Sequence, residues 1–322
     1  AEDGTSQTIT VTITGANDTP TVSTTIADAS TDEDAAYSYD ASANFTDVDT
    51  GDTATYTVSN NPTWMSIDSA TGILSGTPDN DDVATTNITV TRTDTAGESA
   101  SDTFALTVAN TNDTPTVSTT IADASTDEDA AYSYDASANF ADVDTGDTAT
   151  YTATLADDSV LPGWLTITSA GVLSGTPLNA NVGSIEVKVT RTDTAGASAS
   201  DTFALTVANT NDTPVALADT IIISEDAAAT IVSVLDNDTD VDTGDILAIY
   251  TKTNGTNGTV TLVDGILSYT PDADFNGVDT FQYKVTDGTD QSDLATVTVN
   301  VTAVNDDPTG SVTIAGDAKT GQ

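Results

Sequence analysis

The sequence predicts an all-β chain of tandem Greek-key β-sandwiches arranged end to end. Three observations support this prediction: long segments of the sequence recur, apolar residues alternate with polar ones, and turn-forming residues interrupt the chain at short intervals. The chain has 322 residues, a length that suits three domains of roughly 100 residues each.

The recurring segments set the domain boundaries. Residues 20–56 return at 115–151 with one change, Thr46 to Ala141, and residues 91–115 return at 190–214 with one change, Glu98 to Ala197. A third, more diverged copy follows, and the phrase Asn-Asp-x-Pro closes every unit. We therefore expect the terminal strand of a preceding repeat with its linker at 1–19, repeats at 20–113, 114–212 and 213–307, and the opening strand of a following repeat at 308–322.

Within each repeat the apolar residues have the period of a β-strand. In the last strand Phe104, Leu106 and Val108 alternate with small or polar residues, which predicts one buried and one solvated face. The corresponding positions in the other repeats are Phe203, Leu205, Val207, Val297, Val299 and Val301. About seven such strands per repeat fit an immunoglobulin-like sandwich, and no segment has the pattern of a helix.

Charge and composition exclude several classes of function. With 51 acidic and 6 basic residues the net charge is −45, so a nucleic acid partner is not expected, because phosphate binding depends on Lys and Arg. No apolar run is long enough to insert in a membrane. The chain has no cysteine and no histidine, which removes disulfides and imidazole or thiolate chemistry. Its acidic residues recur in tandem and face domain boundaries, so we do not expect an enzyme.

Four sequence elements carry acidic or amide residues to each boundary when the strands are threaded as an immunoglobulin-like sandwich. They are the loop between the second and third strands, the turn between the last two strands, the linker, and a glutamate after the first strand of the preceding repeat. The candidate metal ligands are Asn17, Asp18, Glu33, Asp47, Asp49, Asp94, Asn110, Asn112, Asp113, Glu128, Asp142, Asp144, Asp193, Asn209, Asn211, Asp212, Glu225, Asp240, Asp242, Asp287, Asn305 and Asp306.

Such a set of oxygen donors requires a cation if no basic side chain lies among them, as we expect here. Two like charges about 4 Å apart repel by roughly 4 kcal/mol at an effective dielectric of 20. Flexible loops with many oxygen ligands favour Ca²⁺ over Mg²⁺, which demands octahedral geometry and keeps its waters. The simpler interpretation is that these are ordinary acidic turn residues.

Specific motifs give each unit a resemblance to cadherin-type repeats. Asn110-Thr-Asn112-Asp113-Thr-Pro115 resembles the cadherin linker, Asp142-Val-Asp144 the paired-Asp loop, Arg191-Thr-Asp193 the late Asp motif and Glu33 the early glutamate. With Pro62-Thr-Trp64-Met and Pro162-Gly-Trp164-Leu, each followed by Gly-x-Leu-Ser-Gly-Thr-Pro, the first two repeats are similar to dystroglycan-type cadherin-like repeats. With Val234-Leu-Asp-Asn-Asp238, Tyr269-Thr-Pro271 and Asp274-Phe-Asn-Gly277, the third resembles the cadherin-like repeats of giant bacterial RTX-type adhesins. The resemblance implies Ca²⁺ at the junctions. Two departures are Asn110 and Asn209 in place of Asp, and segments 78–82 and 177–181 in place of the Asp-Arg-Glu element.

These observations predict a calcium-rigidified spacer of an extracellular adhesin on a bacterial cell surface. Its partners would be the neighbouring repeats of the same chain, with the adhesive ligand bound elsewhere in the parent protein. One alternative is a module that binds a glycan or protein, for which Trp64, Trp164 or the diverged segment 155–162 could supply a site. Another is a salt-adapted acidic sandwich that needs no calcium.

Overall fold

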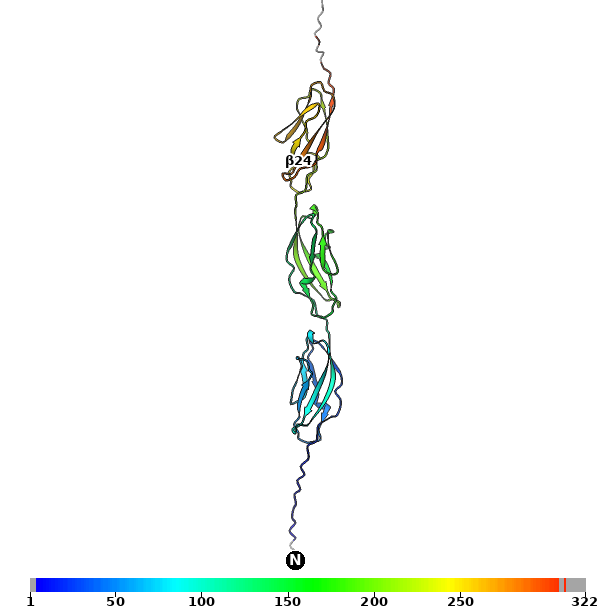
Figure 1. Ribbon diagram of the computed structural model, residues 1–322, viewed down its shortest axis with the longest axis vertical. Helices are drawn as coiled ribbons and strands as arrows, with labels where there is room; N and C mark the ends of the chain where they lie inside the picture. The colour runs from blue at the N-terminus through cyan, green and yellow to red at the C-terminus, as the bar shows by residue number, and fades with distance from the viewer. Residues whose placement is uncertain (1–3, 307–309, 311–322) are drawn as a thin grey trace, which may run out of the picture.

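The computed structural model describes residues 4–306 and 310, which fold into three β-sandwiches. Figure 1 shows the sandwiches following one another along the long axis of an extended molecule. Within the described residues the regular structure consists of strands and four one-turn 3-10 helices. The predicted all-β fold of tandem sandwiches is confirmed.

The first sandwich packs a four-stranded sheet on a three-stranded one. The four-stranded sheet has the order β2 (Ala29–Asp32), β9 (Ser99–Ala109), β8 (Thr85–Thr93), β5 (Thr55–Ser59). The three-stranded sheet has the order β3 (Tyr37–Asp40), β7 (Ile73–Gly76), β6 (Ser66–Ile67), and the short strands β1 (Thr21–Val22) and β4 (Phe45–Thr46) form a separate pair. Two one-turn helices complete this sandwich, η1 (Ser42–Asn44) and η2 (Asn80–Asp82).

The second sandwich repeats this arrangement strand for strand. Its larger sheet has the order β11 (Ala124–Asp127), β18 (Ser198–Ala208), β17 (Gly183–Thr192), β14 (Thr150–Leu155). Its smaller sheet has the order β12 (Tyr132–Asp135), β16 (Val172–Gly175), β15 (Leu165–Ile167), beside the pair β10 (Thr116–Val117) and β13 (Phe140–Ala141). The one-turn helices are η3 (Ser137–Asn139) and η4 (Asn179–Asn181).

The third sandwich keeps the two main sheets but reduces the short strand pair to one bridge, Val215 to Thr239. Its sheets have the orders β19 (Asp219–Ser224), β25 (Ala295–Thr302), β24 (Gly277–Thr286), β21 (Ala248–Lys252) and β20 (Thr230–Ile231), β23 (Ile266–Pro271), β22 (Gly258–Val263).

Each core lies between the two sheets and consists of the predicted alternating residues. Phe104, Leu106 and Val108 are buried, as are their counterparts in the second and third sandwiches. Burial of one such side chain contributes about 1.5–3 kcal/mol. Trp64 packs at the edge of the first core, perpendicular to Tyr37 with ring centroids 6.2 Å apart.

Strand direction decides which acidic residues reach which end of a sandwich. β2 runs parallel to β9, so the residue after β2, Glu33, lies beside the end of β9, and its N–H donates to the Ala109 carbonyl at 3.0 Å. β8 and β9 are antiparallel, which places the turn with Asp94 at the opposite end. The first sandwich therefore carries carboxylates at both of its ends.

The two strands predicted outside the three sandwiches, at 1–19 and 308–322, have different outcomes. Residues 4–20 form no strand, so the terminal strand expected at 1–19 is not observed there. A strand needs a partner strand to satisfy its backbone groups, and no described strand pairs with this segment. The opening strand expected at 308–322 lies outside the described residues apart from Gly310. No helix in the described ranges has the length and apolar character needed to cross a membrane.

Candidate metal centre

The structure gathers the predicted ligands at four junctions. The first junction holds Asn17, Asp18, Asp47, Asp49 and Asp94; the second holds Glu33, Asn110, Asn112, Asp113, Asp142, Asp144 and Asp193; the third holds Glu128, Asn209, Asn211, Asp212, Asp240, Asp242 and Asp287; the fourth holds Glu225, Asn305 and Asp306. Two kinds of acidic cluster occur at these junctions.

The first kind, here called the interface site, joins neighbouring sandwiches. At the second junction it consists of Glu33, Asp113 and Asp144, whose carboxylate oxygens lie within 4.8 Å of one another. Asp144 Oδ2 accepts the Asp113 N–H at 2.7 Å, and Glu33 Oε1 accepts a linker N–H at 2.6 Å. Glu33 is only 2% exposed, yet its Oε2 has no hydrogen-bond partner in the part of the chain that the structure describes. A buried carboxylate oxygen without a donor is costly unless a cation binds it.

The third junction repeats the interface site with Glu128, Asp212 and Asp242. Asp242 Oδ2 accepts the Asp212 N–H at 2.6 Å, and Glu128, also 2% exposed, has an Oε2 without a partner. Here the two sandwiches touch directly, because the Asn179 amide of the second donates to Asp242 Oδ1 of the third at 3.1 Å. The same orphaned oxygen at two successive junctions marks a recurrent feature of this fold.

The second kind of cluster, here called the loop site, lies within one sandwich next to its preceding linker. It consists of Asp47, Asp52 and Asp94 in the first sandwich and of Asp142, Asp147 and Asp193 in the second. Both loop sites are tied to their linkers, by Asn17 donating to Asp94 Oδ2 at 3.0 Å and by Asn112 donating to Asp193 Oδ2 at 3.0 Å.

These amide donors also set the charge state of the loop sites. The Asn112 amide holds the pKa of Asp193 below its ordinary value, helped by backbone N–H groups of its turn and opposed by burial. Asn17 lowers the pKa of Asp94 in the same way. Both carboxylates are therefore ionised well below neutral pH.

The expectation that no basic side chain lies near the carboxylates is wrong for the first two sandwiches. The Arg92 guanidinium lies 3.8 Å from Asp47 Oδ2, and the Arg191 guanidinium lies 3.1 Å from Asp142 Oδ2. Each arginine stands two residues before the turn aspartate on a strand whose alternation points it into the loop site.

In the third sandwich the positions equivalent to a loop site are Asp240, Asp245 and Asp287, and the charges of the other two act on Asp245. Partial loss of solvation, and then the charges of Asp242, Asp240 and Asp287, raise the pKa of Asp245. Loss of solvation also acts on Asp287, but the N–H groups of its turn and the Asn211 amide outweigh it and hold the pKa of Asp287 below its ordinary value. Crowded like charges of this kind favour a bound cation.

The acidic cluster at the fourth junction is the least suited to binding a cation. Both Glu225 oxygens accept hydrogen bonds, from the Val304 N–H at 2.6 Å and from the Asn276 amide at 3.0 Å. Asp306 lies with Asp226 and Asp274 in an exposed cluster, where loss of solvation and the neighbouring charges raise the pKa of Asp306. The Asn305 amide donates to the Asp306 carbonyl at 3.3 Å.

Several residues of these sites were missing from the predicted ligands. They are Asp52, Asp147, Asp245, Asp226, Asp274, Asp290, Asn80 and Asn179. The signal for the first three was present, because each follows its paired-Asp loop at the same offset in all three repeats. Asn80 and Asn179 lie on the one-turn helices of segments that depart from the cadherin pattern, so nothing in the resemblance indicated them.

The chemistry of these sites is that of cation binding. At the interface sites the contributing groups are carboxylates, amides and backbone groups, whose oxygens are hard ligands when they bind a metal. Interface-site residues would hold a calcium ion through the orphaned glutamate oxygens and the aspartates beside them. The ion would supply the positive charge that these buried oxygens lack.

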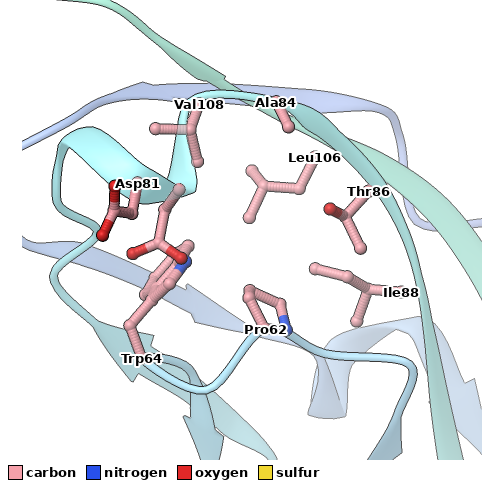
Figure 2. Close-up of a pocket in the computed structure, with 9 residues that line it drawn as sticks. Pro62, Trp64, Asp81, Ala84, Thr86, Ile88, Leu106 and Val108 are labelled. Carbon is pink, nitrogen blue, oxygen red and sulfur yellow. The ribbon is translucent and has the colours of Figure 1, made fainter.

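A partly open hollow lies between the sheets of the first sandwich (Figure 2). Its volume is about 150 Å³, and its walls include Trp64, Asp81, Leu106 and Val108. Ligand pockets for small organic molecules typically measure about 300–1,000 Å³. This hollow is too small for such a ligand.

Comparison with known proteins agrees with the fold. EC22–24 of mouse cadherin-23 is 19% identical to this chain, with a TM-score of 0.53, and the match covers 90% of this chain and 100% of that one. EC21–23 of human CDH23 is 18% identical, with coverages of 84% and 97% and a TM-score of 0.53. These likenesses concern the fold alone. The chain spans only 45% of an endo-fucoidan hydrolase from glycoside hydrolase family 107, at 24% identity and a TM-score of 0.31, which supports no argument.

Family models cover the three sandwiches in turn. No curated protein matches the chain. Residues 211–302 match the model of a bacterial Ig domain. Residues 19–109 and 114–208, together more than half of the chain, match the model of a putative Ig domain. The chain therefore belongs to the putative Ig domain family, with a bacterial Ig domain as its third sandwich.

Proposed function

We propose that the chain is a calcium-rigidified spacer from an extracellular adhesin on a bacterial cell surface. In this function calcium locks each sandwich to the next and holds a distal adhesive domain away from the cell. The partners of each sandwich are its neighbours in the same chain, and the adhesive ligand is bound elsewhere in the parent protein. An origin in a giant RTX-type adhesin is part of the proposal.

The observation that carries the proposal is the composition of the interface sites. Glu33 belongs to the first sandwich, Asp113 to the linker and Asp144 to the second sandwich. An ion bound to all three would tie two sandwiches and their linker into one body. Without an ion the same three charges repel one another by roughly 1–4 kcal/mol per pair, depending on the effective dielectric.

The linkers give a cation its mechanical effect. Between β9 and β10 only the residues 110–115 connect two sandwiches, and they carry little apolar surface. Their contacts to the sandwiches are hydrogen bonds to carboxylates, such as those of Asn110 and Asp113 to Asp144. The stiffness of the junction therefore depends on the charge balance around those carboxylates.

Calorimetric titration tests the proposal directly. Metal-stripped protein should bind calcium with dissociation constants of about 10⁻⁴–10⁻³ M, the range of extracellular modules, and should bind magnesium much more weakly. The second and third junctions, which have ligands from both sides, should hold more calcium than the first and fourth. Absence of calcium binding would contradict the proposal, and equal occupancy at all four junctions would contradict the cross-domain ligand set.

A ligand-binding module remains the second candidate. The observation that favours it is an open surface hollow at the diverged segment of the second sandwich, lined by Leu155, Asp157 and Ile185. Its volume of about 230 Å³ is below that of a pocket for a whole small molecule, so it would hold only part of a larger glycan or peptide. Trp64 and Trp164 support it less, since both pack against their cores. Glycan array binding by the chain, lost on Leu155→Asp, would favour this candidate over the spacer.

A further inference from the structure

The three loop sites are not equivalent, because one buried position beside them is an arginine in the first two sandwiches and a valine in the third. Arg92 pairs with Tyr56 across β8 and β5, and Arg191 pairs with Tyr151 across β17 and β14. The same register places Val285 opposite Ile249 in the third sandwich. Val285 is fully buried and takes the position of the two arginines.

In the first two sandwiches the arginine acts as a cation built into the loop site. Its side chain is 10% exposed for Arg92 and 8% for Arg191, and the partner aspartate is 3% exposed in both cases. Arg92 Nε and Nη1 and Arg191 Nη1 have no hydrogen-bond partner among the described residues, so these buried guanidinium groups are held by charge attraction to the carboxylates. A divalent ion at the same place would meet a positive charge only a few ångströms away.

The third loop site lacks that charge and has more acid. Asp47 Oδ2, Asp142 Oδ2 and Asp240 Oδ2 are all buried without a hydrogen-bond partner among the described residues. The first two lie beside an arginine, whereas no lysine or arginine within the described ranges forms an ion pair with Asp240 of this site. Asp290 joins it, since the Asn211 amide donates to Asp287 and to Asp290 at 3.1 Å each.

The third loop site also lacks the threonine hydrogen-bond donor of the first two, and a hollow adjoins it. The threonines that donate to the corresponding aspartates in the first two sandwiches, Thr95 and Thr194, are replaced by Gly288. A hollow of about 500 Å³ adjoins the site and is lined by Asp242 and Asp245, which leaves space for an ion with its waters.

We propose that Arg92 and Arg191 replace a divalent cation at the first two loop sites, and that the third loop site binds an additional calcium ion through Asp240, Asp245, Asp287 and Asp290. This inference rests on the proposed calcium function and assigns the ions unequally to tandem junctions. The second junction is then partly neutralised by the chain itself. The third depends more strongly on calcium.

A matched pair of substitutions tests the assignment by counting ions calorimetrically in the full chain. Asp240→Asn should lower the number of bound calcium ions by one, whereas Asp142→Asn, the same change beside Arg191, should leave the number unchanged. Arg191→Met, which keeps the aliphatic bulk and removes the charge, should add one ion, and Arg191→Lys should add none.

Equal losses in Asp240→Asn and Asp142→Asn would overturn the inference, as would an unchanged count in a folded Arg191→Met protein. If Arg191→Met does not fold, the two aspartate variants still decide the question. If the wild type binds calcium but Asp240→Asn and Asp142→Asn lose the same number of ions, this inference alone is refuted. A wild type that binds no calcium would refute the proposed function as well. A second readout is the melting temperature in chelator, which should fall for Arg191→Met because the loop site then has no cation.

Discussion

Replacing Glu33 by glutamine should have opposite effects on stability with and without calcium. The substitution preserves shape and keeps an acceptor for the Thr111 N–H, but it removes the charge of the buried orphaned oxygen. In chelator the variant should be more stable than the wild type. In calcium it should be less stable.

The magnitude follows from the geometry of the interface site. At a separation of 4.8 Å, the limit within which the oxygens of Glu33, Asp113 and Asp144 lie, each pair repels by about 0.9 kcal/mol at the dielectric of water and about 3.5 kcal/mol at an effective dielectric of 20. The variant relieves two such pairs and weakens one charge-assisted hydrogen bond by about 1 kcal/mol. The net gain in chelator is therefore about 1 kcal/mol or more, whereas calcium at about 100 times its dissociation constant adds about 2.7 kcal/mol to the wild type alone.

Thermal unfolding in chelator and in about 10 mM calcium, a concentration set by the expected affinity, provides the assay. For domains of this size 1 kcal/mol corresponds to about 4–8 °C in melting temperature. Glu128→Gln should reproduce the effect at the third junction, and the exposed Glu186→Gln on β17 is the charge-matched control with no such effect. If Glu33→Gln behaves like Glu186→Gln in both buffers, the interface site does not bind calcium.

Three further outcomes are expected. Asp144→Ala should reduce calcium affinity at the second junction at least about tenfold while the far-ultraviolet circular dichroism stays unchanged, because Asp144 bonds the linker and not the core; loss of β-structure in saturating calcium would argue against this role. Burial and, more weakly, Asp238 raise the pKa of Asp219, so the folded state binds this proton more tightly than the unfolded state and stability falls as pH rises from about 4 through the raised pKa. Asp219→Asn should therefore stabilise the third sandwich at neutral pH in chelator and flatten its pH profile, and an unchanged pH profile of the melting temperature would count against it. Gly175→Ala should destabilise the second sandwich by about 2 kcal/mol or more in urea unfolding, since a Cβ there would lie 1.8 Å from the Trp164 carbonyl oxygen, whereas Gly163→Ala meets nothing within 4 Å and should be neutral.

Repetition in the sequence made the fold predictable. A period of two, repeated in register over three units, left few alternatives for the strands, and residues such as Phe104 and Phe203 are buried as their alternation predicts. The exception is the N-terminal segment, where Ile9, Val11 and Ile13 have strand alternation but remain exposed because no described strand pairs with them. Alternation predicts which face of a strand is buried, but it does not predict which strand pairs with it.

The positions of the acidic clusters could be predicted from the sequence, but the arginines that partly neutralise them could not. The threading carried Glu33 and Asp144 to one junction, because chain direction decides which loops meet at which end. The arginines were missed as members of the loop sites, since Arg191 is separated from Asp142 by 49 positions. Only the pairing of β17 with β14 brings Arg191 to the loop before β14, which carries Asp142. Ion pairs between distant segments depend on register, which composition does not reveal.

Small-angle scattering in calcium, in chelator and in magnesium tests the central claim most directly. Each sandwich has longest strands of about ten residues, so three in line with their linkers should give a rod of about 120 Å in calcium. In chelator the β-structure should persist by circular dichroism while the distribution of maximum dimensions broadens, and magnesium should not restore the rod. A scattering curve that chelation leaves unchanged would contradict a calcium-rigidified spacer.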